Sequence, residues 1–345
     1  FGMLPPGCHI HLQRQTREQV LRSLRKLVQQ NWRRLKTELQ AYVALRGRTE
    51  IQLASFLSEQ AIDLDDLYRS SGRSGWTNLK RDAGLLNTPP GSEDDYFGRR
   101  FGDLLHIDDL PRTDLLLSLR EPAANYGSKS DRERLLLQML AYQVDGQQHQ
   151  QGSGEDFLKR LRGHPEQAGE LAELGGILQA RSSLLSKPVP GLEDVPLCLH
   201  AAYGIREILT ALGWLSASRR TPFQAGVLAL HERKVELLFV TLDKREGYHE
   251  RIAYRDYAIS PALLHWQSQN SAGPTTPAGR RYLESPGNGW RFQLFVRAGK
   301  GAPYRACGPV TLERAEGAKP MRNHWRLSVP LPPRLFREFS ILRGE

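Results

Sequence analysis

The chain has 345 residues and a formal net charge of +10, and its length predicts two or three domains, since single cores rarely exceed about 250–300 residues. Its three cysteines, Cys8, Cys198 and Cys307, are too few for a disulfide framework and too far apart for a zinc-ligand spacing. No apolar run approaches the ~20 residues that cross a bilayer, and no secretion signal opens the chain, so we expect an intracellular protein without membrane contact.

Because the first residue is Phe1 rather than Met, we expect a fragment or a processed product.

The first predicted elements are helices. In 15–45, apolar residues recur at steps of three, four or seven, which predicts a helix whose basic face meets phosphates or solvent. Shorter helices at 52–60, 63–68 and 76–81 are compatible with a helix-turn-helix-like unit, or with any compact helical bundle.

A second helical segment is predicted at 87–192. After a loop at 87–95, apolar stripes favour helices at 96–108, 113–120, 131–142, 155–163 and 166–184. His106-Ile-Asp-Asp109 has metal-binding residue types, but an acidic turn at a helix end explains it better. Cys8-His-Ile-His11 offers at most two ligands from one side of an extended chain, so we expect no metal.

The pattern changes after Lys187-Pro-Val-Pro-Gly191. One helix is expected at 201–213, followed by β-type segments at 227–231, 235–242, 290–296, 304–313 and 324–329, the first two forming a hairpin. The sequence therefore predicts an α+β fold: a helical linker region at 1–86, a helical bundle at 87–192 and a mainly β domain at 193–345. The size of the last domain fits a small barrel.

The positive charge lies in this last part. Residues 196–345 contain 22 lysines and arginines against 12 aspartates and glutamates, which gives +10, the net charge of the whole chain. A basic domain attracts polyanions, because contacts to phosphates release condensed counterions. Charge and residue types together favour nucleic-acid binding, while a genome bias or a need for solubility is the alternative.

One stretch combines the side chains that reading a base requires. Tyr254-Arg-Asp-Tyr-Ala-Ile-Ser260 is followed by His265-Trp-Gln-Ser-Gln-Asn270. A protein that reads a base by flipping it needs a pocket with aromatic faces, an acceptor for an amino group and polar groups for the base edge. We predict these site residues: Tyr254, Asp256, Tyr257, Trp266, Gln267, Ser268, Gln269 and Asn270. Phosphate contacts are predicted for Arg255, Arg280, Arg281 and Arg297.

Alternation along a strand sets a condition on this pocket. Tyr254 and Asp256 point to one side of an extended strand and Tyr257 to the other, so a shared pocket needs a turn. The aromatic residues fit the core of a β domain as well, and Asp256 fits a cap of the turn before Ser260-Pro261.

Several ordered blocks resemble a known domain. They include Thr221-Pro-Phe-Gln-Ala-Gly-Val227, Leu238-Phe-Val-Thr-Leu-Asp-Lys244, the two site segments and Gly308-Pro-Val310. Together they resemble the C-terminal DUF3427 domain of superfamily 2 helicase-like proteins, and Leu4-Pro-Pro-Gly-Cys-His-Ile10 resembles the segment that joins a helicase core to it. The resemblance implies a bacterial, cytoplasmic parent with a phospholipase D-like nuclease and an ATP-driven helicase, similar to type IV restriction enzymes. An SRA/PUA-like barrel is the fold analogy.

The motifs of a motor and a nuclease are absent from this sequence. It has neither a Gly-x-x-x-x-Gly-Lys-Ser/Thr loop nor a His-x-Lys pair, so we expect no enzymatic activity and no cofactor. We interpret the chain as a target-recognition fragment that reads 5-methylcytosine or 5-hydroxymethylcytosine in double-stranded DNA, by base flipping. Its other expected partners are the helicase and nuclease domains of the parent. The alternatives are a protein-interaction or autoinhibitory module that docks on the helicase, and a non-specific DNA clamp.

Overall fold

The structure is a computed structural model that describes most of the chain. The described residues are 32–47, 51–69, 74–120, 129–146, 153–216, 218–219, 223, 226–243, 256–269 and 271–340. The chain divides into two compact units, residues 1–102 and 103–345. The boundaries at 86/87 and 192/193 that the sequence predicts stay predictions.

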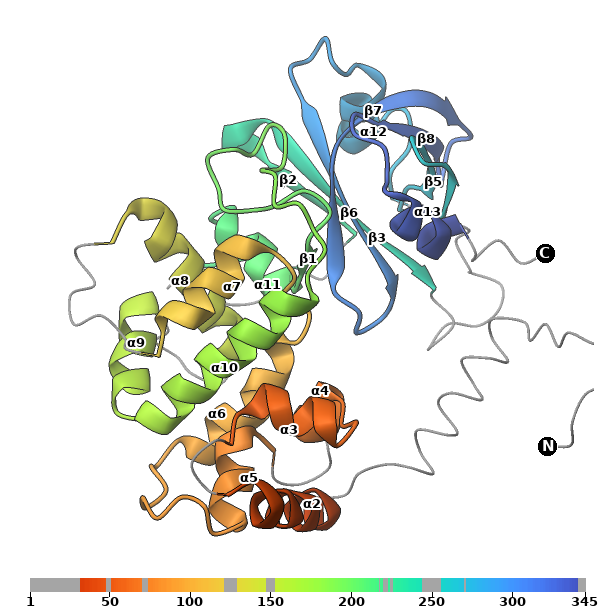
Figure 1. The fold of residues 1–345 in the computed structure, drawn as a ribbon. Helices are drawn as coiled ribbons and strands as arrows, with labels where there is room; N and C mark the ends of the chain where they lie inside the picture. The colour runs from red at the N-terminus through yellow and green to blue at the C-terminus, as the bar shows by residue number, and fades with distance from the viewer. Residues whose placement is uncertain are drawn as a thin grey trace, which may run out of the picture. The chain divides into compact units, whose positions relative to one another are not determined.

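The secondary structure described in the first unit consists of helices joined by short loops (Figure 1). Its helices are α2 (Trp32–Arg46), α3 (Leu53–Glu59), α4 (Leu64–Tyr68), α5 (Trp76–Asp82) and α6 (Asp94–Arg100), which runs into a 3₁₀ turn at Phe101–Leu104. Fully buried Phe56 and Trp76 stack with ring centroids 5.4 Å apart and so join α3 to α5. The helix predicted at 15–45 is confirmed from Trp32 onward, while 15–31 lie outside the described residues.

The second unit begins with helices that start close to the predicted positions. They are α7 (Leu110–Ser118), α8 (Asp131–Asp145), α9 (Gly154–Arg162), α10 (Pro165–Arg181) and α11 (Ile205–Ala211). Ser130 and Ser153 fix the starts of α8 and α9, because each hydroxyl accepts the backbone N–H of an acidic residue whose carboxylate reaches back. Among the described residues, no helix combines the length and the apolar character that a membrane span requires.

The helix predicted at 96–108 is shorter in the structure. Helix α6 stops at Arg100 and tightens into the 3₁₀ turn. A new helix, α7, starts after Asp109, whose Oδ1 accepts the backbone N–H of Arg112 at 3.1 Å. The side chain that was expected to mark a helix end therefore marks a helix beginning.

One mixed sheet follows, with the strand order β2-β3-β6-β7-β8-β5-β4, and β1 pairs with β7 (Figure 1). The strands are β1 (Ala202–Tyr203), β2 (Val227–Leu230), β3 (Val235–Asp243), β4 (Tyr257–Ser260), β5 (Leu263–Gln267), β6 (Arg291–Gly299), β7 (Tyr304–Glu316) and β8 (Arg322–Leu327). Two helices complete the unit, α12 (Pro277–Leu283) and α13 (Pro333–Ser340).

The strands predicted from the sequence are confirmed. Strands β2 and β3 form the expected antiparallel hairpin around a 3₁₀ turn at His231–Arg233. Strands β6, β7 and β8 match the segments predicted at 290–296, 304–313 and 324–329. At Gly308, where φ is 84°, the pairing of β7 with β6 shifts register.

The sheet is not closed, so it does not support the SRA/PUA-like barrel expected from the sequence. Among the described strands, β2 pairs only with β3 and β4 only with β5, which leaves both as edges. Closure would require these two strands to pair. The sheet is mixed because β3 runs parallel to β6, and the β4–β5 hairpin and α12 lie within the crossover between them. N-terminal helices followed by a sheet remain as predicted.

One face of the sheet, which we call the inner face, carries the core of this domain. Its cluster includes Trp266, Tyr282, Phe292, Trp325 and Phe339, so that α12 and α13 both cover this face. Phe292 and Trp325 have ring centroids 4.9 Å apart. The side chains that alternate with these core residues on β4, β5, β7 and β8 point to the opposite face.

Candidate functional site

Asp256 is held by the backbone near its own hairpin. Its side chain is 3% exposed, and Oδ1 accepts the backbone N–H of Gln267 at 2.9 Å. This bond ties the start of β4 to the end of β5, across the turn at Pro261 and Ala262. Tyr254, Arg255 and Asn270 lie outside the described residues.

Trp266 lies in the core. It is 4% exposed on the inner face, with ring centroids 6.0 Å from Tyr282 and 6.4 Å from Trp325. Tyr257 lies on the opposite face, because it is the register partner of His265. The structure therefore does not bring Trp266 and Tyr257 to one surface, although the sequence grouped them.

The opposite side of β4, β5, β8 and β7 forms a surface that we call the outer face. Its centre is a row of register partners across the four strands: Tyr257, His265, His324 and Arg314. The rings of Tyr257 and His265 are stacked, 5.1 Å apart at 15°, and His324 is 5.4 Å from His265. Tyr257 and His324 are half-buried, while His265 is 8% exposed. The neighbouring rows are Gln267, Arg322 and Glu316 on one side, and Leu263, Arg326 and Thr311 on the other.

The arginines of the outer face are exposed. Arg314 forms an ion pair with Glu316, and Arg326 Nη2 lies 2.5 Å from Glu313 Oε2. Arg322 has no ion pair among the described residues. Exposed pairs of this kind stabilise a fold by only about 0–1 kcal/mol, so these guanidinium groups can exchange a carboxylate for a phosphate at small cost.

The polar residues at the end of β5 have different surroundings. Ser268 is fully buried, where its Oγ accepts the N–H of Met321 at 2.9 Å and donates to the carbonyl of Ala272 at 3.1 Å. Gln267 and Gln269 are half-buried. Ser268 thus holds the sheet together, and Gln267 is the member of this group that the register places on the outer face.

Two of the predicted phosphate-contacting arginines have partners within the protein. Arg281 Nε lies 2.6 Å from Oε2 of Glu236, a fully buried carboxylate that also accepts the Tyr282 hydroxyl at 2.9 Å. Burial first, and then the charge of Glu236, raises the pKa of Tyr282. Arg297 donates from Nε to Thr241 Oγ1 at 2.8 Å.

Arg280 is different, since it is exposed on α12 and has no ion pair among the described residues.

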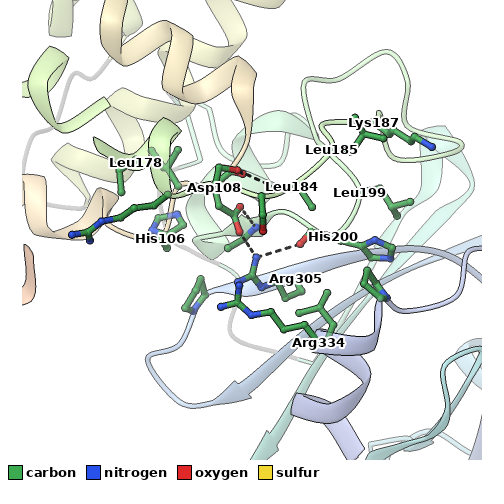
Figure 2. Close-up of a pocket in the computed structure, with 18 of the residues that line it drawn as sticks. His106, Asp108, Leu178, Leu184, Leu185, Lys187, Leu199, His200, Arg305 and Arg334 are labelled. Carbon is green, nitrogen blue, oxygen red and sulfur yellow. Dashed lines mark hydrogen bonds and ion pairs between the residues drawn. The ribbon is translucent and has the colours of Figure 1, made fainter. Parts of the chain in front are cut away.

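A pocket of about 570 Å³ lies within the second unit, beside the end of α10, β7 and α13 (Figure 2). We call it the basic pocket, because its lining includes Arg181, Lys187, Arg305 and Arg334. Asp108 is the one acidic side chain among the described residues that line it. Apolar walls come from Leu178, Leu184, Leu199 and Leu335. Its shape and charge suit an anionic ligand with an apolar part.

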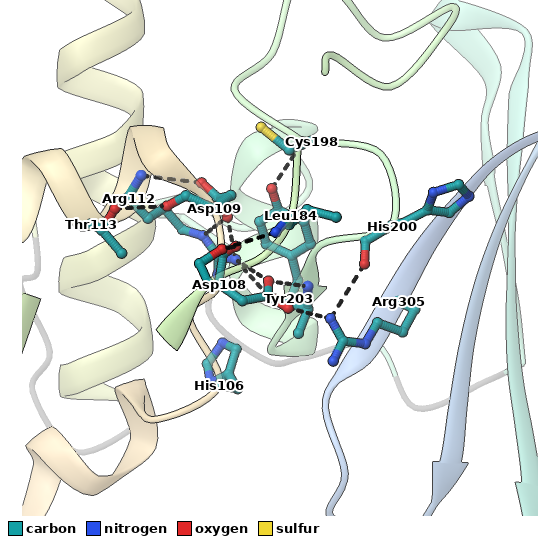
Figure 3. Close-up of polar contacts among 12 residues, drawn as sticks. His106, Asp108, Asp109, Arg112, Thr113, Leu184, Cys198, His200, Tyr203 and Arg305 are labelled. Atoms are coloured by element: carbon teal, nitrogen blue, oxygen red, sulfur yellow. Dashed lines mark hydrogen bonds and ion pairs between the residues drawn. The ribbon is translucent and has the colours of Figure 1, made fainter. Parts of the chain in front are cut away.

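A buried polar network borders the basic pocket (Figure 3). Arg112 is 3% exposed and donates from Nε to Asp109 at 2.6 Å and from Nη1 to Glu207 at 2.8 Å. Its Nη2 donates to the carbonyl of Ala202 at 2.5 Å, and its guanidinium lies 3.9 Å from the ring centroid of Tyr203. Arg112 therefore ties α7 to β1 and α11.

The charges of this network set one another's pKa values. Burial raises the pKa of Glu207, but the charges of Arg112 and His106 outweigh burial and lower it to about 2. Burial lowers the pKa of Arg112, while Asp109 and Glu207 raise it well above its usual value. His106 Nε2 lies 2.5 Å from the Glu207 carboxylate. Glu207 and Arg112 are thus both charged at neutral pH.

Asp108 links this network to the sheet. Its Oδ1 accepts the N–H of Ala202 at 2.9 Å, and its Oδ2 pairs with Arg305, which also donates to the carbonyl of His200 at 3.3 Å. The sequence indicated only an acidic turn at this place. In the structure, Asp109 of this turn caps the start of α7. The sequence carried no local signal for Glu207 or Arg305. No group of three or more His, Cys, Asp or Glu in the described stretches is arranged to hold a metal ion.

Comparison with protein families matches residues 197–339 to a domain of unknown function, DUF3427. The matched segment contains strands β1 to β8 with α11 and α12, and ends within α13. It confirms for these residues the resemblance that the ordered sequence blocks indicated. No curated protein matches the chain.

Proposed function

We propose that the second unit binds DNA through the outer face of its sheet. The observation that carries the proposal is the row of Tyr257, His265 and His324, which has arginines in its own and its neighbouring rows. Flat rings give unpaired bases a stacking surface, and arginines beside them reach the backbone phosphates. The excess positive charge of residues 196–345 supports the same conclusion.

The finer part of the proposal is that the base is a cytosine modified at position 5. It rests on the likeness of the sequence to a domain carried by modification-dependent restriction proteins, whose helicase and nuclease would be partners in the same chain. Trp266 is occupied in the core, so in this proposal a flipped base stacks at Tyr257 instead. Gln267 then lies on the same face to contact the base edge.

The test is a fluorescence anisotropy titration of the full chain with single-stranded DNA and with matched duplexes that carry cytosine, 5-methylcytosine or 5-hydroxymethylcytosine. Tyr257→Ala should weaken binding roughly 5- to 150-fold, the range of about 1–3 kcal/mol that stacking on one base contributes. Arg322→Ala should weaken binding to every sequence and reduce the salt slope by about one.

Arg337→Ala is the control, since this exposed arginine lies on α13, which covers the inner face. It should bind like the parent chain. A preference for modified duplexes of tenfold or more, about 1.4 kcal/mol, would support the cytosine reading. Equal, salt-sensitive binding to all three duplexes would indicate a non-specific DNA clamp. No binding to any DNA would favour the protein-interaction module that docks on a helicase.

A further inference from the structure

The described residues that line the basic pocket carry more positive than negative charge. Arg181, Lys187 and Arg334 are exposed lining residues, and none has an ion-pair partner among the described residues. The carboxylate of Asp108 is already engaged by Arg305 and by the N–H of Ala202. Three cations around one cavity, without an ion-pair partner among the described residues, create a positive potential that attracts an anion.

His200 is a nearly buried part of the pocket wall. Its side chain lines the basic pocket and is 8% exposed, and its backbone is left-handed, with φ at 66°. Nε2 of the ring is buried, with no hydrogen-bond partner in the part of the chain that the structure describes. A buried polar atom without a partner costs about 1–3 kcal/mol, and because Nε2 has almost no accessible surface, a ligand in the open pocket does not reach it. His200 therefore contributes to the wall of the pocket and not to the recognition of a ligand.

The size and the walls of the pocket limit the class of ligand. A volume of about 570 Å³ falls within the range of roughly 300–1,000 Å³ typical of small-molecule sites, and far exceeds a single inorganic anion. Leu178, Leu184, Leu199 and Leu335 offer apolar contact to the rest of the molecule. Guanidinium groups bind phosphate through paired hydrogen bonds, which favours phosphate as the charged part.

We propose that the basic pocket is a binding site for an organic phosphate, of the class of nucleoside phosphates. Its phosphate groups contact Arg334, Lys187 and Arg181, and its ring or apolar body lies against the leucines. The site goes beyond the proposed DNA contact: Arg334 and Leu335 belong to α13, which covers the inner face, whereas the proposed DNA contact lies on the outer face.

Isothermal titration calorimetry of the full chain with ATP, AMP, pyrophosphate and adenosine tests this site. We expect saturable binding of ATP or AMP, weaker binding of pyrophosphate and none of adenosine. Arg334→Glu and Lys187→Glu should each weaken nucleotide binding at least tenfold. Arg337→Glu is the matched control on the same helix, with the same change of charge outside the pocket, and should leave nucleotide binding unchanged.

The outcomes separate this site from the proposed DNA contact. Arg322→Ala on the outer face should keep full nucleotide affinity, whether or not it loses DNA. A short DNA strand with a 5′-phosphate that displaces ATP, where its dephosphorylated form does not, would identify a DNA end as the source of the phosphate. The proposal is overturned if none of the phosphates binds, if adenosine binds as well as AMP, or if Arg334→Glu and Lys187→Glu bind ATP like Arg337→Glu.

Discussion

Replacing Arg112 should strongly destabilise the second unit. Arg112→Met keeps much of the side-chain volume but leaves the buried carboxylates of Asp109 and Glu207 without their shared cation. Removing one partner of a buried ion pair costs about 3–5 kcal/mol, because the remaining charge stays desolvated. We expect the free energy of unfolding in urea at neutral pH to fall by that amount.

The control for this change is Arg337→Met, which replaces an exposed arginine without an ion pair among the described residues. It should alter the free energy of unfolding by less than about 0.5 kcal/mol. If Arg112→Met destabilised the protein no more than this control, the network would not hold α7, β1 and α11 together.

His200 should make stability depend on pH. Burial first, and then the charge of Arg305, lowers its pKa from 6.5 to about 4. Between these two pH values the unfolded chain binds a proton at His200 more readily than the folded chain. The contribution of neutral His200 to the free energy of unfolding is therefore fully present above pH 6.5 and is lost as the pH falls toward 4. Asparagine tolerates the left-handed backbone, so His200→Asn should fold and lose less stability over this window.

Urea midpoints of the two proteins across this pH range measure the effect, and equal slopes would contradict it. At lower pH both proteins should lose stability again. The pKa of Glu207 is held down at about 2 against an unfolded value of 4.5, so its contribution is present above pH 4.5 and is lost below it. That second loss should therefore be common to the parent and to His200→Asn.

At the scale of elements, two neighbouring glycines of α10 should respond in opposite directions to the same change. A Cβ on Gly175 would lie 2.7 Å from Leu116 Cβ and 3.3 Å from the Thr113 carbonyl of α7. A Cβ on Gly176 would meet only Leu117 Cδ2, at 3.8 Å. Alanine favours a helix over glycine by about 1 kcal/mol. Gly176→Ala should therefore raise the free energy of unfolding.

Gly175→Ala should lower the free energy of unfolding by about 1–3 kcal/mol, because the new methyl group forces α7 and α10 apart. Thermal unfolding of the two single variants gives the comparison. Equal stabilisation by both would mean that the two helices pack less closely at Gly175 than the structure has them.

Local patterns in the sequence predict most of these elements. Apolar periodicity placed α8 and α9 within a few residues, because a helix start is decided by neighbouring residues, and the caps Ser130 and Ser153 fix it in the structure. Strands β4 and β5 were not predicted: they have four and five residues, and a bulge between Ala258 and Ser260 interrupts their short pattern. The sequence could not decide whether the sheet closes into a barrel, since closure depends on the pairing of distant edges.

The candidate site shows the same limit. Alternation predicts that Trp266 points away from His265 and Gln267, but not which side is buried, and the packing of Tyr282 and Phe339 against the inner face decides that. Arg112 and Glu207 meet across 95 positions of the chain. Contacts between residues so far apart leave no periodic signal in one sequence, which is why the Arg112 network could not be predicted.

At the scale of the whole molecule, the sheet separates the two proposed sites. Arg322 and Tyr257 lie on the outer face, whereas Arg334 lies on α13, which covers the inner face. Charge alone would have assigned all of these residues to one polyanion-binding surface. The separation makes the sites testable one at a time, because each contains an exposed arginine that the other lacks.

The division of the chain into residues 1–102 and 103–345 leads to a prediction about its unfolding. The second unit contains the sheet with its core cluster and the Arg112 network, all built from residues beyond 102. A fragment of residues 103–345 should therefore fold alone. Its thermal midpoint should lie within about 4 °C of the matching transition in the full chain, which corresponds to about 1 kcal/mol for a unit of this size.

Scanning calorimetry of the fragment and the full chain makes the comparison, and Arg112→Met in both identifies the transition that belongs to the second unit. If the units fold independently, Arg112→Met moves one transition of the full chain and leaves the other in place. A fragment that unfolds without a cooperative transition, or a full chain in which Arg112→Met moves every transition together, would show that residues 1–102 are part of the same folding unit.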